Sequence, residues 1–378
     1  MREELPAEGL RMAVCPLPVT IIGGLTGTEG GPALGFSAGD WALLAFMPND
    51  EGRVRLYSTD YPGITEFSLG NLKTPARGDW GRYAVWAART LRDRYGIETG
   101  FTGVLSLPRI SVEAGGHAAE SMLLLIALGA VNGIGLSPKD AAGLAKEMDD
   151  EYAKSLESPA WRAIAAHGRK GSLLYADTAT GNAVHYPGPE REDAFRIMTV
   201  YSGMPAGALT DVLRARTGEC RNAAGFLGIM GGLRSAPTLS HVPEKVFAEK
   251  SGKLPEELRR RASHFYAESS RAVSGAAAWK AGDLVKLGRL MNESTESTLN
   301  NYEAGDPAVR SLVEIMGGTD GVYGCAYDGG VSLTGLVHKD FPEEAGEGIL
   351  KVFADRHPEP GDKAAVYFSG TGDGLRIV

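Results

Sequence analysis

The 378-residue sequence contains few cysteines and no long uninterrupted apolar run. Cys15, Cys220 and Cys325 are far apart, and no second cysteine or histidine stands at metal-ligand spacing, which argues against a disulfide framework and against a zinc site. We expect three reduced thiols, no metal-ligating residues among them and a cytoplasmic location. The most apolar window, 122–136, is interrupted by glycines and is too short to span a bilayer, and no secretory leader is recognised.

The chain also lacks an excess of basic residues. Its 39 lysines and arginines are outnumbered by 47 aspartates and glutamates, which gives a formal net charge of −8, and the basic residues are scattered. This balance argues against nucleic acid or a membrane as the main partner. Because 43% of the residues are hydrophobic, we expect a globular protein that binds a small molecule or another protein.

Hydrophobic periodicity predicts a mixture of strands and helices. The expected elements of the first half are short antiparallel strands at 41–46, 53–57 and 64–69, a helix over 80–95, an apolar run at 101–107, a buried helix from Met122, a helix over 141–156 and a strand at 171–175. The breaker-rich stretch 187–193 indicates a boundary between two domains, 1–190 and 191–378. After it, a strand at 195–200 precedes several helices and a final β, β, α, β order, which suits helices packed on a small antiparallel sheet.

The second half resembles the galactokinase branch of the GHMP small-molecule kinases, and galacturonokinases in particular. The stretches that carry this resemblance are Arg196–Gly203, Arg216–Ala224, Gly282–Ser294, Asn301–Glu303 and Gly321–Gly324. Shorter similarities in the first half and at the end of the chain extend it nearly from end to end. The resemblance implies an α+β fold of two domains, the first similar to ribosomal protein S5 and the second a ferredoxin-like sandwich. It also implies ATP and Mg²⁺ in the interdomain cleft, and phosphoryl transfer to C1 of a hexose or hexuronate.

The family's first motif consists of a proline, an arginine, a glycine followed by Glu-His-x-Asp, and two further glycines. Without gaps it falls on 16–31. Pro18 then replaces the arginine that steadies phosphoryl charge, and Gly27 replaces the aspartate that holds sugar hydroxyls. The resemblance places the substrate against Gly23, Gly24, Leu25, Gly27, Gly30 and Gly31.

Two glycine-bearing loops correspond to the family's cofactor-binding segments. Counting back from Ser137 aligns 113–118 with a phosphate loop that is normally rich in serine, and all three serines are absent. The loop instead begins with Glu113. A carboxylate about 4 Å from a phosphate opposes binding by roughly 4 kcal/mol at an effective dielectric constant of 20. The candidate cofactor-binding residues are Glu113, Ala114, Gly115, Gly116, His117, Ala118, Asp328, Gly329 and Gly330.

The family's catalytic aspartate aligns with Trp161, and Glu157 is the nearest carboxylate. Loss of a general base typically costs about 10²–10⁴-fold in rate. His117 is a third catalytic candidate, although a histidine at a helix start is more often a polar terminus and a tryptophan on an amphipathic helix is more often a core residue. Glu113, Glu120 and Asp328 could together bind a cation, or could simply be solvated carboxylates.

The motifs therefore predict a galactokinase-like protein whose kinase activity is weak or lost. Three alternatives stay open: a working sugar kinase, a pseudokinase or repurposed enzyme that uses the old cleft, and a structural subunit that uses it as an interface. The expected partner is a small sugar or sugar acid, and a positively charged pocket near Arg162, Arg169, Lys170 or Arg196 would favour an acidic one. The sequence leaves the oligomeric state open.

Overall fold

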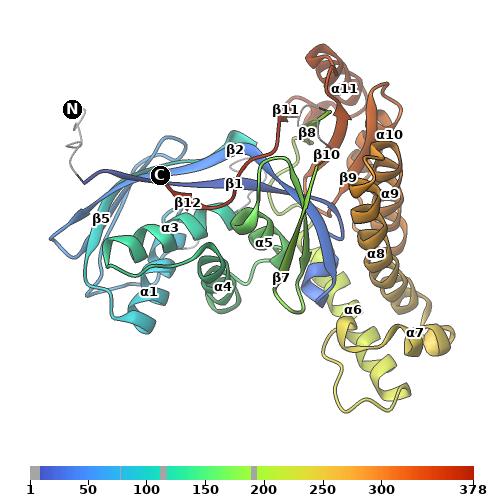
Figure 1. Ribbon diagram of the computed structural model, residues 1–378, viewed down its shortest axis with the longest axis horizontal. Helices are drawn as coiled ribbons and strands as arrows, with labels where there is room; N and C mark the ends of the chain where they lie inside the picture. Colours follow the sequence, from blue (N-terminus) through green and yellow to red (C-terminus); the bar gives the residue numbers. More distant parts are fainter. Residues whose placement is uncertain (1–8, 77, 111–116, 189–193) are drawn as a thin grey trace.

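Two β-sheets joined by long helices make up the fold (Figure 1). The computed structural model describes residues 9–76, 78–110, 117–188 and 194–378. The strands of the eight-stranded sheet are β1 (Arg11–Ile22), β2 (Pro32–Asn49), β3 (Arg53–Ser58), β4 (Ile64–Ser68), β5 (Gly100–Ser106), β6 (Ser172–Asp177), β7 (Asn182–Pro187) and β12 (Arg376–Ile377). Those of the four-stranded sheet are β8 (Phe195–Tyr201), β9 (Val322–Tyr327), β10 (Ser332–His338) and β11 (Ala365–Ser369).

The helices of the first half are α1 (Arg82–Tyr95), α3 (Ala118–Val131), α4 (Pro138–Met148) and α5 (Pro159–His167). Those of the second half are α6 (Thr210–Met230), α7 (Glu244–Lys250), α8 (Glu256–Lys280), α9 (Leu284–Ser297), α10 (Pro307–Gly317), α11 (Glu343–Arg356) and α12 (Pro358–Gly361). Single turns are η1 (Thr26–Glu29), η2 (Asp149–Ala153), η3 (Leu239–His241), η4 (Ser251–Lys253) and η5 (Thr298–Tyr302). None of the helices in the described ranges is long and apolar enough to cross a membrane.

The long strand β2 organises the larger sheet. Its outer half lies between β1 and β5, whereas its inner half pairs with β1 and β6, so the sheet branches along β2. The order along the main path is β12-β1-β2-β5-β3-β4, and the pairing of β3 with β5 is parallel. Helices α1, α3, α4 and α5 lie along one face of this sheet (Figure 1). Helix α3 is apolar on all sides and is buried over most of its length, as expected for a helix between a sheet and other helices.

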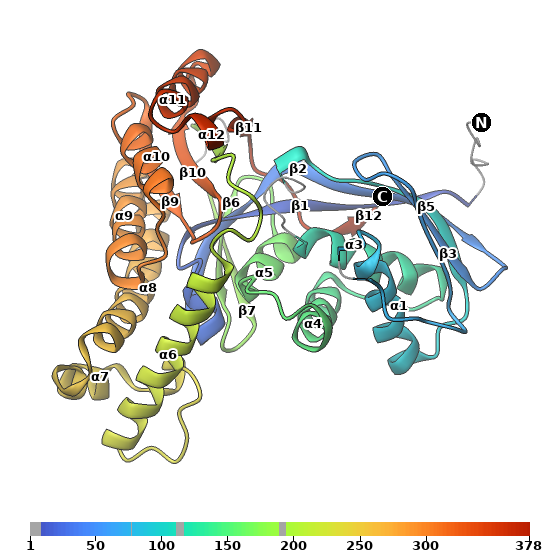
Figure 2. The same ribbon diagram turned by 180° about the vertical axis from the view of Figure 1, so that it is seen from behind.

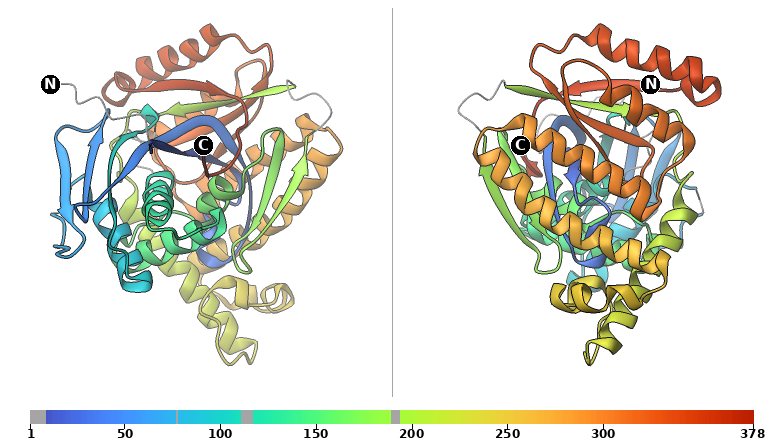
Figure 3. Two further views of the ribbon diagram at one scale, coloured as in Figure 1. Left: turned by 60° about the vertical axis from the view of Figure 1, so that its left-hand side comes forward. Right: turned by 90° about the vertical axis from the view of Figure 1, so that its right-hand side faces the viewer.

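A second core joins the two sheets. Phe36 on β2 packs against Phe195 on β8 and against Trp279 on α8, with ring centroids 5.5 Å and 5.2 Å away. Helices α8 and α9 run side by side along this junction (Figure 3). The smaller sheet has the order β11-β8-β10-β9 and packs with α10 and α11 on its far side. Because one continuous apolar cluster contains residues of both sheets, the two halves are held in a defined relation.

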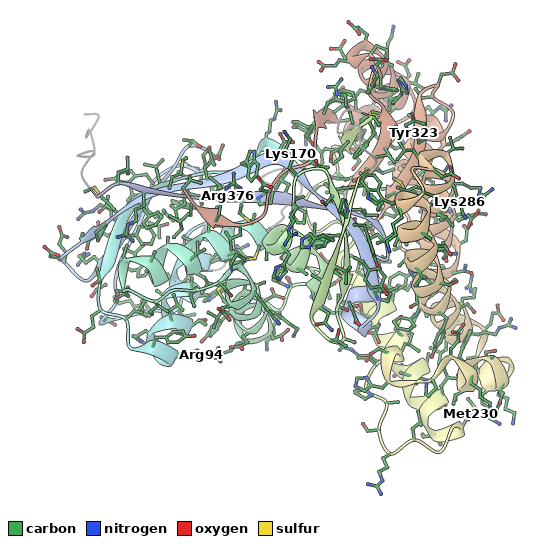
Figure 4. All side chains as sticks on the ribbon, viewed as in Figure 1. Arg94, Lys170, Met230, Lys286, Tyr323 and Arg376 are labelled. Atoms are coloured by element: carbon green, nitrogen blue, oxygen red, sulfur yellow. The ribbon has the colours of Figure 1, made fainter. Side chains whose placement is uncertain are left out.

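Helices α6 and α7 and the chain between them project beyond the second half (Figure 2). Figure 4 places Met230 near the far end of α6 and Lys286 on the outer side of α9. The projection has a core of its own, formed between the inner face of α6 and the first half of α8. Helix α8 thus links the projection to the junction of the two sheets.

The structure confirms the predicted α+β fold and the final β9, β10, α11, β11 order. Two expectations about elements were wrong, and two strands were not predicted. The helix expected over 141–156 ends at Met148 and is followed only by the single turn η2, which ends where Lys154 adopts a left-handed backbone with φ 50°. The strands β1 and β7 were not predicted, since prolines interrupt the alternation of β1. Strand β3 pairs in parallel with β5 rather than only in antiparallel fashion.

Candidate ligand-binding cleft between the two sheets

A cavity of about 440 Å³ lies between the two halves of the molecule. This volume is within the range typical of small-molecule sites. The first half contributes parts of β1 and β2, the start of α3, the segment 153–157 and Trp161 of α5. The second half contributes β8, the start of α6 and the turn between β9 and β10, which is residues 328–331. The lining residues range from Leu17 to Thr334, so segments about 300 residues apart in the sequence form one cavity.

Asp328 and Trp161 occupy the inner wall of the cavity. The hydroxyl of Thr20 on β1 donates a hydrogen bond to Oδ2 of Asp328 over 2.9 Å. Burial raises the pKa of the Asp328 carboxyl, and the hydrogen bond from Thr20 acts against this rise. The indole of Trp161 lies close enough to lower the pKa of Asp328 slightly. The Nε1 atom of Trp161 is nevertheless buried without a hydrogen-bond partner among the described residues. A polar donor and a carboxylate thus lie close together in the wall of the cavity.

The turn that follows β1 is packed tightly against this wall. A methyl group added to Gly24 would lie 2.5 Å from Cβ of Asp328, and one added to Gly27 would lie 2.2 Å from Oγ of Ser158. Both distances are far shorter than van der Waals contact. The amide of Gly23, which has φ 79°, donates to Oε2 of the buried Glu268 on α8 over 2.7 Å. Two glycines of the turn therefore have no room for a side chain as the surrounding residues are now placed.

Glu157 is held by groups on two sides. Its Oε1 accepts a hydrogen bond from the backbone N–H of His117 over 2.6 Å, and its Oε2 lies 3.3 Å from the guanidinium of Arg162. Arg162, whose side chain is 4% exposed, also pairs with Asp149 at 3.4 Å. Because two carboxylates surround this one buried cation, Arg162 has no charge to spare for a ligand.

His117 lies beside the cavity rather than in its lining. Its Nδ1 is 3.1 Å from Oε2 of the buried Glu120, and its ring stacks on Tyr83 with centroids 4.4 Å apart. Arg82 approaches its Nε2 at 3.5 Å. The side chain is thus committed to a small cluster at the start of α3, and it meets the cavity only through its backbone bond to Glu157.

Carboxylates outnumber cations in the described lining. Asp40, Glu157 and Asp328 contribute to it, and the cations are Lys154 and Arg214. Arg214 is 62% exposed and pairs with Asp211 at 3.2 Å. ATP and Mg²⁺, which the family resemblance implies, would meet mainly carboxylates on this part of the wall, and the segment 113–116 that aligns with the phosphate loop lies outside the described residues. Within the described ranges, no group of three or more acidic, histidine or cysteine side chains is arranged to hold a metal ion.

The structure brings together many of the residues singled out from the sequence. The cavity is lined by Ala118, Glu157, Trp161, Asp328, Gly329 and Gly330. Gly24 and Leu25 line a smaller adjoining space together with Trp161 and Asp328, whereas Gly30 and Gly31 lie against Ser240 and Thr26. Glu113, Ala114, Gly115 and Gly116 lie outside the described residues. Of the basic residues named above, Arg196 pairs with Glu343 on the far side of the smaller sheet and does not line the cavity.

Several lining residues were not singled out from the sequence. Asp40 on β2 reaches the cavity, and its pKa is raised by burial alone. Thr199 and Thr334 lie directly opposite each other on β8 and β10, and Ser332 is on the same face. The alternation of small hydroxyl residues along β10 was the available signal, because alternate residues of a strand face the same side. Which side faces the cleft depends on the packing of both sheets, which the sequence does not state.

Comparisons with known proteins agree with this architecture. No family model matches the chain. A galacturonokinase from Arabidopsis thaliana is 26% identical over 341 residues, covering 85% of this chain and 80% of the relative. A galactokinase from Staphylococcus carnosus strain TM300 is 26% identical over 380 residues, covering 97% of this chain and 94% of the relative. The crystal structure of Lactococcus lactis galactokinase complexed with galactose superposes with a TM-score of 0.86 at 20% identity, over 98% of this chain and 95% of that one.

The chain is a galactokinase-like member of the GHMP kinases. The mevalonate kinase of Methanococcus jannaschii has the same fold at greater distance, with a TM-score of 0.66 and 15% identity over 97% of this chain. In this galactokinase-like protein the two sheets and the helices between them are thus those of the family.

Proposed function

We propose that this galactokinase-like protein binds a small sugar or sugar derivative in its interdomain cavity, and that its ATP-dependent phosphorylation of a hexose or hexuronate at C1 is weak or lost. One observation carries the proposal. Trp161, which aligns with the family's catalytic aspartate, lies in the wall of a ligand-sized cavity. An indole cannot accept a proton from a sugar hydroxyl, so this position supplies shape and an N–H donor but no base.

The packing of the turn after β1 supports the same conclusion. Alignment with the family motif puts glutamate at Gly24 and aspartate at Gly27, and both positions are filled by neighbours. Cβ of Asp328 and Oγ of Ser158 stand 2.5 Å and 2.2 Å from where the first side-chain atoms would begin. The family's sugar-holding aspartate therefore cannot be restored by a single substitution without moving Ser158.

A working sugar kinase is the second candidate, because other carboxylates line the same cavity. Asp328 has a raised pKa and Glu157 stands four residues before Trp161, so either could accept a proton from a substrate. ATP and Mg²⁺ are the cofactors of this candidate, with Glu113, Ala114, Gly115, Gly116, Gly329 and Gly330 around the phosphates. Against it stand the engagement of Glu157 by Arg162 and the presence of Pro18 where the family has arginine.

Titration calorimetry followed by an ADP-release assay separates the two candidates. Galactose, galacturonate, glucuronate and arabinose are titrated with and without Mg-ATP, and ADP formation is then measured with each. Sugar binding without sugar-dependent ADP formation supports the proposal. ADP formation that disappears in both Glu157→Gln and Asp328→Asn, purified in parallel to control for contaminating kinases, would establish the working kinase instead.

A pair of variants tests the packing argument. Gly27→Asp should lower the free energy of unfolding by about 1–3 kcal/mol, because overpacking strains a filled site. Ser158→Ala removes the obstructing oxygen, so the double variant Gly27→Asp/Ser158→Ala should recover part of that loss. Additivity of the two changes in urea denaturation would contradict the proposed contact.

A location in the cytoplasm is part of the proposal. Cys15, Cys220 and Cys325 are all buried and unpaired, and burial raises the pKa of each thiol. Buried, protonated thiols are unreactive and suit a reducing compartment, although they do not require one.

A further inference from the structure

The carboxylate of Glu268 joins the turn after β1 to the helices of the second half. Glu268 lies on α8 and is 1% exposed. Its Oε2 accepts two hydrogen bonds of 2.7 Å, one from the backbone N–H of Gly23 and one from the hydroxyl of Ser294 on α9. Its Oε1 accepts a hydrogen bond of 2.6 Å from Nε of Arg271, one turn further along α8. Three elements of the fold therefore meet at one buried carboxylate, which is not among the described residues that line the cavity.

The amide of Gly23 depends on this carboxylate for its partner. A methyl group added to Gly23, whose φ is 79°, would lie 2.3 Å from the carbonyl oxygen of Pro32, so the residue cannot carry a side chain that would anchor the turn. Its own carbonyl accepts hydrogen bonds from the amide and the hydroxyl of Thr26, both within the turn. Buried amides are normally paired, so loss of the Glu268 carboxylate would leave the Gly23 N–H to find another partner.

The turn that is held in this way belongs to the wall of the cleft. Gly24 follows Gly23 directly, and a methyl group added to it would lie 2.5 Å from Cβ of Asp328 and 3.0 Å from Oγ1 of Thr20. The hydroxyl of Thr20 in turn donates to Asp328. Thr20 and Asp328 line the cavity, and Gly24 and Asp328 line the smaller space beside it. Because these groups are in close contact, a displacement of Gly23 must also displace the wall.

We infer that Glu268 is a positioning residue of the interdomain cleft. Through its hydrogen bond with the amide of Gly23 it fixes the wall formed by Gly24, Thr20 and Asp328. The inference rests on the proposed ligand-binding role of the cleft and explains how that wall is kept in place. Arg271 balances the charge and Ser294 connects α9, so the packing of both long helices reaches the cleft through one carboxylate. Binding sites depend on supporting hydrogen bonds of this kind.

Hydrogen–deuterium exchange read by mass spectrometry tests the inference without any ligand. In Glu268→Ala, peptides that cover 23–31 and 328–331 should exchange at least about tenfold faster, because the wall opens locally, whereas peptides that cover β3 and β4 should keep their natural rate. The matched control is Glu219→Gln, which breaks another ion pair of the helical layer, that with the buried Arg261 at 2.6 Å, and should leave 23–31 unchanged.

A second pair of variants keeps the test decisive where Glu268→Ala does not fold. In Glu268→Gln the single remaining oxygen must serve either Arg271 or Gly23, so exchange in 23–31 should rise. Glu268→Gln/Arg271→Met removes the competing cation and leaves that oxygen for Gly23 and Ser294, so slow exchange should return. Equal exchange of this turn in the single and the double variant overturns the inference, as does exchange that rises equally in every peptide or in none.

Calorimetry with galactose then connects the wall to ligand binding. The affinity should fall at least about tenfold in Glu268→Gln, recover in the double variant and change by less than about twofold in Glu219→Gln. Faster exchange confined to the wall together with unchanged galactose affinity overturns the positioning role. If galactose does not bind the natural protein, the proposed function fails for this sugar, whereas the exchange pattern still decides whether Glu268 holds the wall.

Discussion

Replacing Glu29 with glutamine should make the protein more stable at neutral pH and leave it nearly unchanged in acid. Glu29 ends the turn after β1 and is 1% exposed. Its Oε1 has no hydrogen-bond partner among the described residues, its Oε2 accepts a long bond of 3.5 Å from the amide of Leu239, and Arg221 stands 3.9 Å away with a largely exposed side chain. A carboxylate in this position is poorly compensated.

The magnitude follows from the pKa of this carboxyl. Burial raises it from 4.5 to about 7, and the weak contacts with Leu239 and Arg221 only partly oppose that rise. Each pKa unit corresponds to about 1.36 kcal/mol, so ionised Glu29 costs the folded state about 3 kcal/mol. Because the folded protein binds this proton more tightly than the unfolded chain, stability is full below pH 4.5 and is lost as the pH rises to about 7.

Urea denaturation followed by tryptophan fluorescence at pH 5, 6, 7 and 8 measures the effect. Glutamine has nearly the same shape and does not titrate, so the free-energy difference between Glu29→Gln and the natural protein should grow from about 0.8 kcal/mol at pH 5 to about 3 kcal/mol at pH 8. Other titrating groups are common to both proteins and cancel in the difference. A difference independent of pH, or a variant less stable at pH 8, would refute the reasoning.

Three further predictions concern buried groups of both halves. Arg162→Met leaves two buried carboxylates without their cation and should lower the free energy of unfolding by about 3–5 kcal/mol in urea; a loss below 1 kcal/mol would contradict the buried ion pairs. Burial lowers the pKa of His264 from 6.5 to about 4, so its contribution is full above pH 6.5 and is lost as the pH falls to 4. The advantage of the natural protein over His264→Gln should therefore shrink across that range in thermal scans, and a constant advantage would refute it. Trp279→Ala removes a side chain that is 1% exposed at the junction of the sheets and should cost about 3–5 kcal/mol, whereas Val285→Ala, at 70% exposure, should change stability by less than about 0.5 kcal/mol; equal effects of the two would contradict the shared core.

Much of the fold could be predicted from local pattern. The alternation in 53–57 and 64–69, the helical spacing from Trp80 and the buried run from Met122 each gave the right kind of element, because side-chain burial sets these periods. The helix start at Ser137 was also right, and its side chain accepts the amide of Asp140 in a capping box. Pairing was harder to predict. Strand β12 closes against β1 at the opposite end of the sequence, and no local pattern specifies so distant a partner.

The candidate site was only partly predictable. Alignment with the family located Trp161 and Asp328, and both line the cavity. It did not show that Asp328 would meet Thr20, because that contact joins residues 308 positions apart. Nor did it indicate Asp40, a lone aspartate in an apolar strand, which joins the lining because distant segments of the chain meet around the cavity.

The lack of side chains at two positions of the turn after β1 is physically coupled to the placement of the residues packed against that turn. Glycine at positions 24 and 27 admits Asp328 and Ser158 into space that larger side chains would otherwise take. The backbone of the same turn is in addition fixed by Glu268, which also accepts a hydrogen bond from the hydroxyl of Ser294 over 2.7 Å. A protein that had merely lost its catalytic groups by drift would leave voids there, and interiors tolerate voids poorly. The filled turn beside a ligand-sized cavity therefore supports the proposal that the cleft binds a small molecule without the family's catalytic groups.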